Sequence, residues 1–147
     1  MDDPGLILVI GYGSLIRGDD GLGQVIAERV AQMNLPRVRS LARHQLVPEL
    51  ALELAQANRA IFIDACVDQP ELTVIPLQPR DSPSQNWSHQ FTPESLLSLS
   101  RSLYIRVPEA WMVSVPGFEF GLSDQLSVQA QAGIELAVEK VQALIGA

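Results

Sequence analysis

Short, continuous apolar runs alternate along the chain with stretches in which apolar residues recur at helical spacing. The first run, residues 6–10 (LILVI), ends at a glycine and is typical of a strand buried on both faces of a sheet. Residues 21–33 then carry apolar side chains three or four positions apart, which predicts an amphipathic helix. This alternation favours right-handed crossovers between parallel strands. We therefore expect an α/β protein, with a three-layer α/β/α fold around a mostly parallel, doubly wound sheet.

The same patterns place the other elements along a chain of 147 residues. Further strands are expected at residues 38–41, 60–63, 72–77 and 111–115. Further helices are expected to open at Pro48, to run from Thr92 through about Leu103, and to run from a cap at Ser123 to the end of the chain. Residues 78–91 are rich in proline and serine, which is typical of a loop. Because no linker divides the chain, we expect one domain over residues 1–147.

The chain is acidic, and this excludes several classes of partner. Its formal net charge of −7 opposes binding to nucleic acid and to anionic membranes. No apolar run approaches the roughly 20 residues that a membrane-spanning helix needs. Residues 1–4 carry acids where a secretory signal needs basic residues. We therefore expect a cytoplasmic protein with no membrane and no nucleic-acid partner.

The cysteine and histidine counts limit the kinds of metal site. The single cysteine, Cys66, excludes an internal disulfide and a thiolate cluster, and we expect it to pack inside the protein. A metal site is then limited to carboxylates and the two histidines, His44 and His89.

Ligands of parallel sheets bind beyond the carboxyl ends of the strands, so candidate site residues are expected after Ile10, Ile63, Leu77 or Val115. The segment after the first strand ends in two acids, Asp19 and Asp20, directly before the first helix. A dinucleotide fingerprint would have glycine where Ile16 stands, and acids at a helix N-terminus oppose phosphate binding, so a nucleotide site is disfavoured. We expect one of the two acids to cap the helix, which leaves the other for a different role.

Two further polar residues are candidates for the same site. Asp64 closes the buried run 60–63, where a partly buried carboxylate is costly unless it is paired, hydrogen-bonded or metal-bound. His89 lies in the polar loop before the helix that begins near Thr92. With one acid of the first loop they form an O,O,N ligand set that suits zinc or nickel. The alternatives are a capping or loop-bound aspartate and a surface histidine, and sequence spacing does not decide between them.

Four segments of the chain together carry a family resemblance: residues 8–23 (LVIGYGSLIRGDDGLG), 62–65 (FIDA), 88–90 (SHQ) and 115–123 (VPGFEFGLS). The first is similar to the N-terminal signature of the hydrogenase maturation proteases, endopeptidases that trim the C-terminus of the nickel–iron hydrogenase large subunit. The other three are similar to three later segments of that family, in the same order. The resemblance therefore extends over nearly the whole chain, and it implies the three-layer fold already expected.

The resemblance implies an endopeptidase that removes the C-terminal extension of a nickel-loaded large-subunit precursor. Asp20, Asp64 and His89 correspond to the metal-binding triad of the family, although many members carry glutamate at the position of Asp20. The metal is nickel carried by the precursor, with zinc or a similar divalent ion possible in the isolated protein. For catalysis, Asp20 or Asp64 activates water as a general base, or a bound metal polarises the scissile carbonyl. The expected partner is the large-subunit precursor, and the protein itself is expected to be a monomer.

Two alternatives remain open on the sequence. Residues 44–50 (HQLVPEL) resemble a segment of some subgroups of the family, so His44 is expected to line the crevice and help hold the substrate peptide, unless it is an exposed or capping histidine. The alternative function is a noncatalytic metal- or partner-binding protein of the same fold.

Overall fold

The computed structural model describes residues 5–81 and 91–146, and their centre is one mixed sheet. Its five strands lie in the order β2-β1-β3-β5-β4. Their bounds are β1 (Ile7–Tyr12), β2 (Val38–Arg43), β3 (Arg59–Cys66), β4 (Thr73–Leu77) and β5 (Glu109–Pro116). β1, β2, β3 and β5 pair in parallel, and β4 pairs antiparallel with β5. The predicted mostly parallel α/β fold is therefore confirmed.

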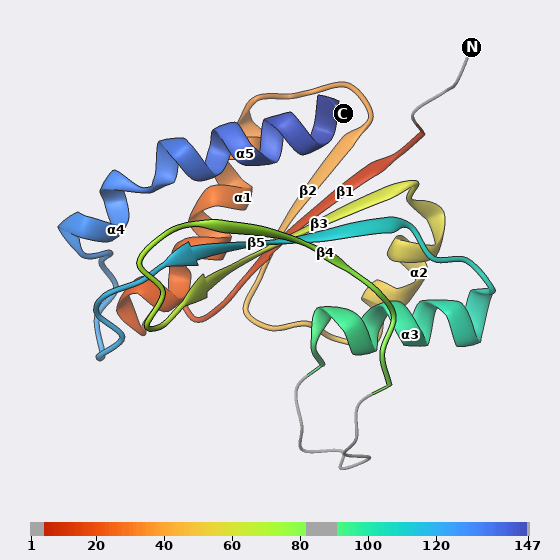
Figure 1. Ribbon diagram of the computed structural model, residues 1–147, viewed down its shortest axis with the longest axis horizontal. Helices are drawn as coiled ribbons and strands as arrows, with labels where there is room; N and C mark the ends of the chain where they lie inside the picture. The colour runs from red at the N-terminus through yellow and green to blue at the C-terminus, as the bar shows by residue number, and fades with distance from the viewer. Residues whose placement is uncertain (1–4, 82–90, 147) are drawn as a thin grey trace.

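Helices cover both faces of this sheet (Figure 1). The helices on one face are α1 (Leu22–Gln32), the short α4 (Val128–Ala132) and α5 (Ile134–Gly146), and those on the other are α2 (Leu50–Gln56) and α3 (Pro93–Tyr104). Alternate residues of β1 enter two separate cores: Ile7 and Val9 pack in the core with α1 and α5, and Leu8 and Ile10 pack in the core with α2 and α3. This explains why the first strand is apolar at successive positions. None of the helices in the described ranges is long and apolar enough to cross a membrane.

The direction of β4 corrects one expectation about the site. Because β4 runs antiparallel to β5, its carboxyl end at Leu77 pairs with Ala110, near the amino end of β5. Leu77 therefore lies at the end of the sheet opposite to the carboxyl ends of the parallel strands, contrary to the expectation that all the strands end at the same edge. Only residues 67–72 connect β3 to β4, whereas a parallel crossover needs a dozen or more residues.

The last helix also begins later than predicted. Ser127, not Ser123, is its cap: the Ser127 hydroxyl accepts a hydrogen bond from the Ala130 N–H at 3.1 Å. Gly133 then separates α4 from α5. The Ser123 N–H instead donates to the Ile16 carbonyl at 3.0 Å, so this serine ties two loops together rather than starting a helix. The predicted start of α3 is confirmed, since Thr92 caps it and Pro93 is its first residue.

The order of the strands places the switch point of the doubly wound sheet at the carboxyl ends of β1 and β3. From β1 the chain passes through α1 to β2 on one side, and β3 pairs with the other side of β1. α1 and α2, the helices that follow β1 and β2, cover opposite faces of the sheet (Figure 1). The strand order reverses at β1, and ligands of doubly wound sheets bind at such a point.

Candidate active site

β1 and β3 bring Tyr12 and Asp64 together. The two strands pair in parallel with Gly11 opposite Ile63, so Tyr12 and Asp64 are the next residues on neighbouring strands. The Tyr12 hydroxyl donates a hydrogen bond to the Asp64 carboxylate. Asp64 was expected directly after the strand, but β3 continues to Cys66, so regular backbone holds the carboxylate on both sides.

The surroundings of Asp64 raise its pKa into the range that suits proton transfer near neutral pH. Burial raises its pKa from 3.8 to about 7, against the lowering effect of the hydrogen bonds from Tyr12 and from the Ala65 N–H. The nearby negative charge of Asp20 also raises it. Asp64 therefore exists in both protonation states near neutral pH, and a general base is most effective under that condition.

Tyr12 lies among three carboxylates. Burial raises its pKa, and the charge of Asp64 and the hydrogen bond to it act in the same direction, followed by the charges of Glu94 and Asp20. Tyr12 consequently stays protonated and remains a hydrogen-bond donor. Glu94 lies in the first turn of α3. The sequence had indicated Glu94 only as part of a helix start, and no spacing signal connects it with Asp64.

Asp20 lies at the end of a loop that folds back on the end of β1. Its carboxylate accepts a hydrogen bond from the Ser14 N–H at 2.8 Å. Gly13 has a φ of +140°, and a Cβ there would lie 1.9 Å from the Asp20 carbonyl oxygen, so the loop needs glycine at this position. The Gln24 side chain also donates to the Gly13 carbonyl at 2.6 Å. Backbone contacts therefore fix the place of Asp20 relative to β1.

Asp19, the other acid of the pair, is completely buried and holds the loop that follows β5. Its carboxylate accepts hydrogen bonds from the N–H groups of Phe118, Glu119 and Ser127 and from the Ser127 hydroxyl, at 2.7–2.9 Å. Burial alone would raise the pKa of Asp19, but these hydrogen bonds outweigh it and lower the pKa. The expectation that one of the two acids caps α1 was wrong, because its N-cap is Gly21, without a side-chain hydrogen bond.

The remaining predicted residues are His89, His44 and Cys66. His89 lies outside the described residues, so the triad with Asp20 and Asp64 stays a prediction. Within residues 5–81 and 91–146, no three histidine, cysteine, aspartate or glutamate side chains are grouped so that they could hold a metal ion. His44 is exposed directly after β2. Cys66 is only partly buried, contrary to the expectation of a core position, because it is the last residue of β3, at the carboxyl end of that strand.

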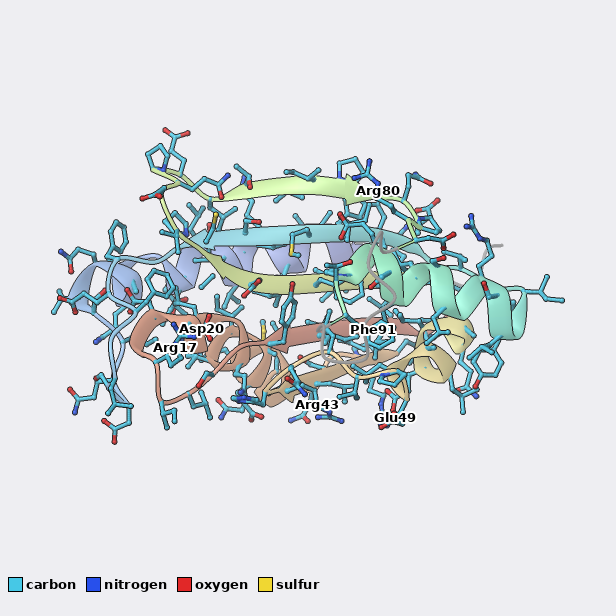
Figure 2. The ribbon with its side chains drawn as sticks, turned by 90° about the horizontal axis from the view of Figure 1, so that it is seen from below. Arg17, Asp20, Arg43, Glu49, Arg80 and Phe91 are labelled. Carbon is cyan, nitrogen blue, oxygen red and sulfur yellow. The ribbon has the colours of Figure 1, made fainter. Side chains whose placement is uncertain are left out.

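Figure 2 shows Asp20 beside Arg17 at one end of the molecule. In chemical terms the structure offers two carboxylates, Asp64 near the end of β3 and Asp20 in the loop after β1, with a tyrosine that donates to Asp64. Such an arrangement can accept a proton from water, bind a cation, or do both.

Comparisons with solved structures identify the fold. No protein-family model matches the sequence, and no curated protein does either. The structure is similar to the hydrogenase maturating endopeptidase HybD from E. coli, with a TM-score of 0.76, 22% identity, and coverage of 95% of this chain and 91% of that one. It is also similar to the [NiFe] hydrogenase maturation protease HycI from Thermococcus kodakarensis KOD1 (TM-score 0.74, 18% identity, coverage of 97% and 93%). A third similar structure is the hydrogenase 2 maturation peptidase from Thaumarchaeota archaeon SCGC_AB-539-E09, with a TM-score of 0.73, 23% identity, and coverage of 96% of this chain and 98% of that one. At these identities the comparisons show a shared fold, and they confirm the fold that the sequence resemblance implies.

Proposed function

We propose that this chain is an endopeptidase that removes the C-terminal extension of a nickel-loaded [NiFe]-hydrogenase large-subunit precursor. One observation carries the proposal: Asp64, at the end of β3, lies within electrostatic reach of Asp20, and its pKa is raised to about 7. The solved proteases with the same fold, together with the resemblance of residues 8–23 to the signature of the family, support the choice of substrate. We further propose that the protein works as a monomer in the cytoplasm.

In the proposed mechanism Asp64 is the general base. Its ionised carboxylate accepts a proton from a water molecule while the water oxygen bonds to the carbon of the scissile carbonyl. The protonated Asp64 then returns that proton to the leaving nitrogen as the C–N bond breaks, so the water is divided between the two products. The Tyr12 hydroxyl orients the Asp64 carboxylate through its hydrogen bond and does not itself exchange a proton.

Asp20, Asp64 and His89 are the proposed contacts to the nickel of the precursor. The donor chemistry fits, since carboxylate oxygens and an imidazole nitrogen suit nickel and zinc alike. The electrostatics also fit, because a cation near Asp20 and Asp64 would offset both the burial of the Asp64 charge, which raises its pKa most, and the smaller repulsion from Asp20. Zinc or a similar divalent ion in the isolated protein would be held by the same side chains. Recognition of the metal would restrict cleavage to a precursor that has received its nickel.

Mass spectrometry of a purified large-subunit precursor, incubated with this protein, tests the proposal. A precursor loaded with nickel is expected to lose a short C-terminal peptide, while the same precursor without nickel keeps its full mass. An unchanged mass of the loaded precursor, together with retained binding, would contradict the protease and favour the noncatalytic binding protein.

Tyr12→Phe is expected to shift the pH dependence of cleavage to higher pH. The hydrogen bond from the Tyr12 hydroxyl lowers the pKa of Asp64, so its loss raises that pKa from about 7 to a higher value. The rise of kcat/KM with pH should move by about one pH unit, the equivalent of one hydrogen bond to a charged group. The rate should therefore fall at pH 6 and recover near pH 9.

Tyr104→Phe is the matched control, since Tyr104 is an exposed tyrosine at the end of α3 and should leave the profile in place. A Tyr12→Phe profile that overlays the wild-type profile would show that the ionisation of Asp64 does not govern the rate.

A further inference from the structure

Two loops at the site end of the sheet expose large apolar side chains. Leu15 and Ile16 lie between β1 and α1 and are 50% and 60% exposed, while Phe118 and Leu122 lie after β5 and are 52% and 88% exposed. We call these four residues the apolar rim. Single exposed apolar residues are common on proteins, but several on adjoining loops are typical of a binding surface.

Hydrogen bonds hold these two loops side by side. The Ser123 N–H donates to the Ile16 carbonyl at 3.0 Å, and the Gly18 N–H donates to the Ser123 carbonyl at 2.9 Å. The Asp19 N–H donates to the Glu119 carbonyl at 2.8 Å, and the buried Asp19 carboxylate adds the hydrogen bonds described above. The rim is thus a preformed surface, and a partner would bind it with little loss of loop entropy.

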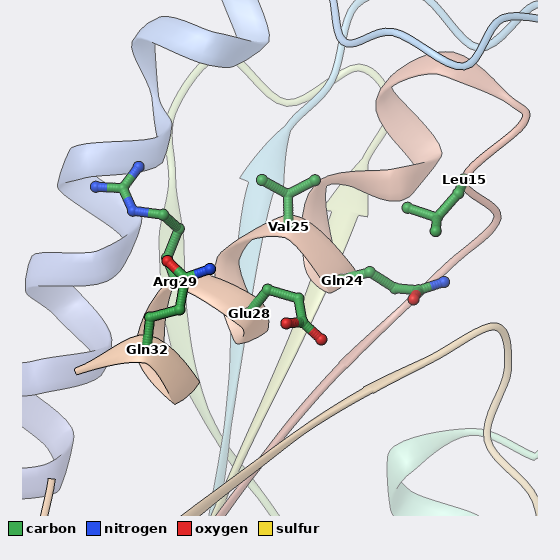
Figure 3. Close-up of a pocket in the computed structure, with 6 residues that line it drawn as sticks. All are labelled: Leu15, Gln24, Val25, Glu28, Arg29 and Gln32. Atoms are coloured by element: carbon green, nitrogen blue, oxygen red, sulfur yellow. The ribbon is translucent and has the colours of Figure 1, made fainter. Parts of the chain in front are cut away.

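The apolar rim adjoins the candidate active site. Ser14, the residue before Leu15, donates its N–H to the Asp20 carboxylate, so the rim begins one residue from a group that contacts Asp20. Leu15 also lines a groove of about 250 Å³ that continues along the outer face of α1 (Figure 3). The other residues that line this groove are Gln24, Val25, Glu28, Arg29 and Gln32.

We infer that the apolar rim is the docking surface for the folded body of the protein substrate whose peptide bond reaches Asp20 and Asp64. This inference rests on the proposed function. A polypeptide cut at the end of β1 and β3 has to pass over the adjoining loops, so the surface that it covers is continuous with the site. The net charge of −7 argues against the other occupants, because it repels both a second copy of this chain and an anionic lipid surface.

The test compares two double variants in cleavage of the nickel-loaded precursor. Ile16→Ser with Leu122→Ser removes half of the apolar rim. Leu103→Ser with Ile105→Ser is the matched control, because these residues are 58% and 87% exposed and lie at the end of α3, away from the site. We expect the rim variant to raise KM about tenfold or more and to leave kcat nearly unchanged, as for the loss of central contacts in an interface. The control variant should keep both constants, and both variants should keep the wild-type melting temperature.

Each other outcome has a defined meaning. Wild-type cleavage with an unchanged KM in the rim variant would overturn the inference and leave the proposed function in place. A wild-type protein that neither binds nor cuts the loaded precursor would overturn the proposed function and this inference with it. A concentration-dependent dimer that the rim variant loses, with KM unchanged, would assign the rim to a second copy and also overturn the inference.

Discussion

Asp64→Asn is expected to abolish cleavage of the precursor and to make the folded protein more stable at neutral pH. Asparagine keeps the size of the side chain but does not accept a proton from water. The loss of a general base lowers kcat by about 10²- to 10⁴-fold. A fold defect would not explain such a loss, because the introduced asparagine still accepts the hydrogen bond from Tyr12 through its side-chain carbonyl oxygen.

The gain in stability follows from the raised pKa of Asp64. The unfolded chain releases the Asp64 proton near the ordinary value of 3.8, whereas the folded chain keeps it until pH is about 7. Between these values the unfolded state binds fewer protons, so the stability of the wild type falls as pH rises. Asparagine does not ionise, so the variant does not lose stability in this way as pH rises. The variant should therefore exceed the wild type in unfolding free energy on the order of 2 kcal/mol at pH 8, after allowance for screening of the partly exposed carboxylate, and the difference should vanish near pH 3.

Urea unfolding at pH 3, 5 and 8, together with single-turnover cleavage, measures both effects. Asp68→Asn is the matched control, because Asp68 is exposed shortly after β3 and its positive φ of 62° is tolerated by asparagine. It should cleave and unfold like the wild type. Full activity of the Asp64→Asn protein would remove Asp64 from the mechanism, and a stability difference independent of pH would contradict its raised pKa.

The sequence predicts the layers of this fold because burial on two faces leaves a plain signal. Residues 7–10 of β1 are all apolar, and such a run is typical of a central strand that helices cover on both faces. The direction of β4 leaves no such signal, since a strand has the same pattern in either direction. Its antiparallel pairing follows from the short connection at residues 67–72. A connection of that length cannot return to the other end of the sheet, as a parallel strand would require.

The site was predicted to a similar, partial extent. The rule that ligands bind beyond strand ends pointed to the segments of Asp20 and Asp64, and the structure brings these two residues within electrostatic reach. The sequence does not predict the different roles of Asp19 and Asp20, because two adjacent aspartates can be distinguished only by the hydrogen-bond partners of each carboxylate. The connection of Tyr12 and Glu94 with Asp64 was missed for a related reason: the three residues lie in separate segments of the sequence, and only folding places them together.

Asp19→Asn is expected to cost about 3–5 kcal/mol of unfolding free energy, which is a large part of the stability of a domain of this size. The Asp19 carboxylate is the acceptor in all four of its hydrogen bonds. Asparagine has an NH₂ group, which is a donor, in place of one of the two carboxylate oxygens. At least one buried N–H or hydroxyl then faces an NH₂ group and loses its partner. Because Asp19 joins η1 (Gly18–Gly21) to the loop after β5, the same change should loosen Asp20 and raise KM.

The pH dependence of this effect separates Asp19 from a neutral packing residue. The pKa of Asp19 is lowered in the folded protein, so its contribution is complete above the ordinary value of 3.8 and is lost as pH falls through the lowered value. The difference in unfolding free energy between wild type and variant should stay constant from pH 5 to pH 8 and shrink below pH 3.8. Asp124→Asn, at an exposed position of the same loop, should leave stability unchanged at every pH. If Asp19→Asn unfolded at the same urea concentration as Asp124→Asn, the buried carboxylate would not be what holds the loop, and the rigidity of the apolar rim would need another source.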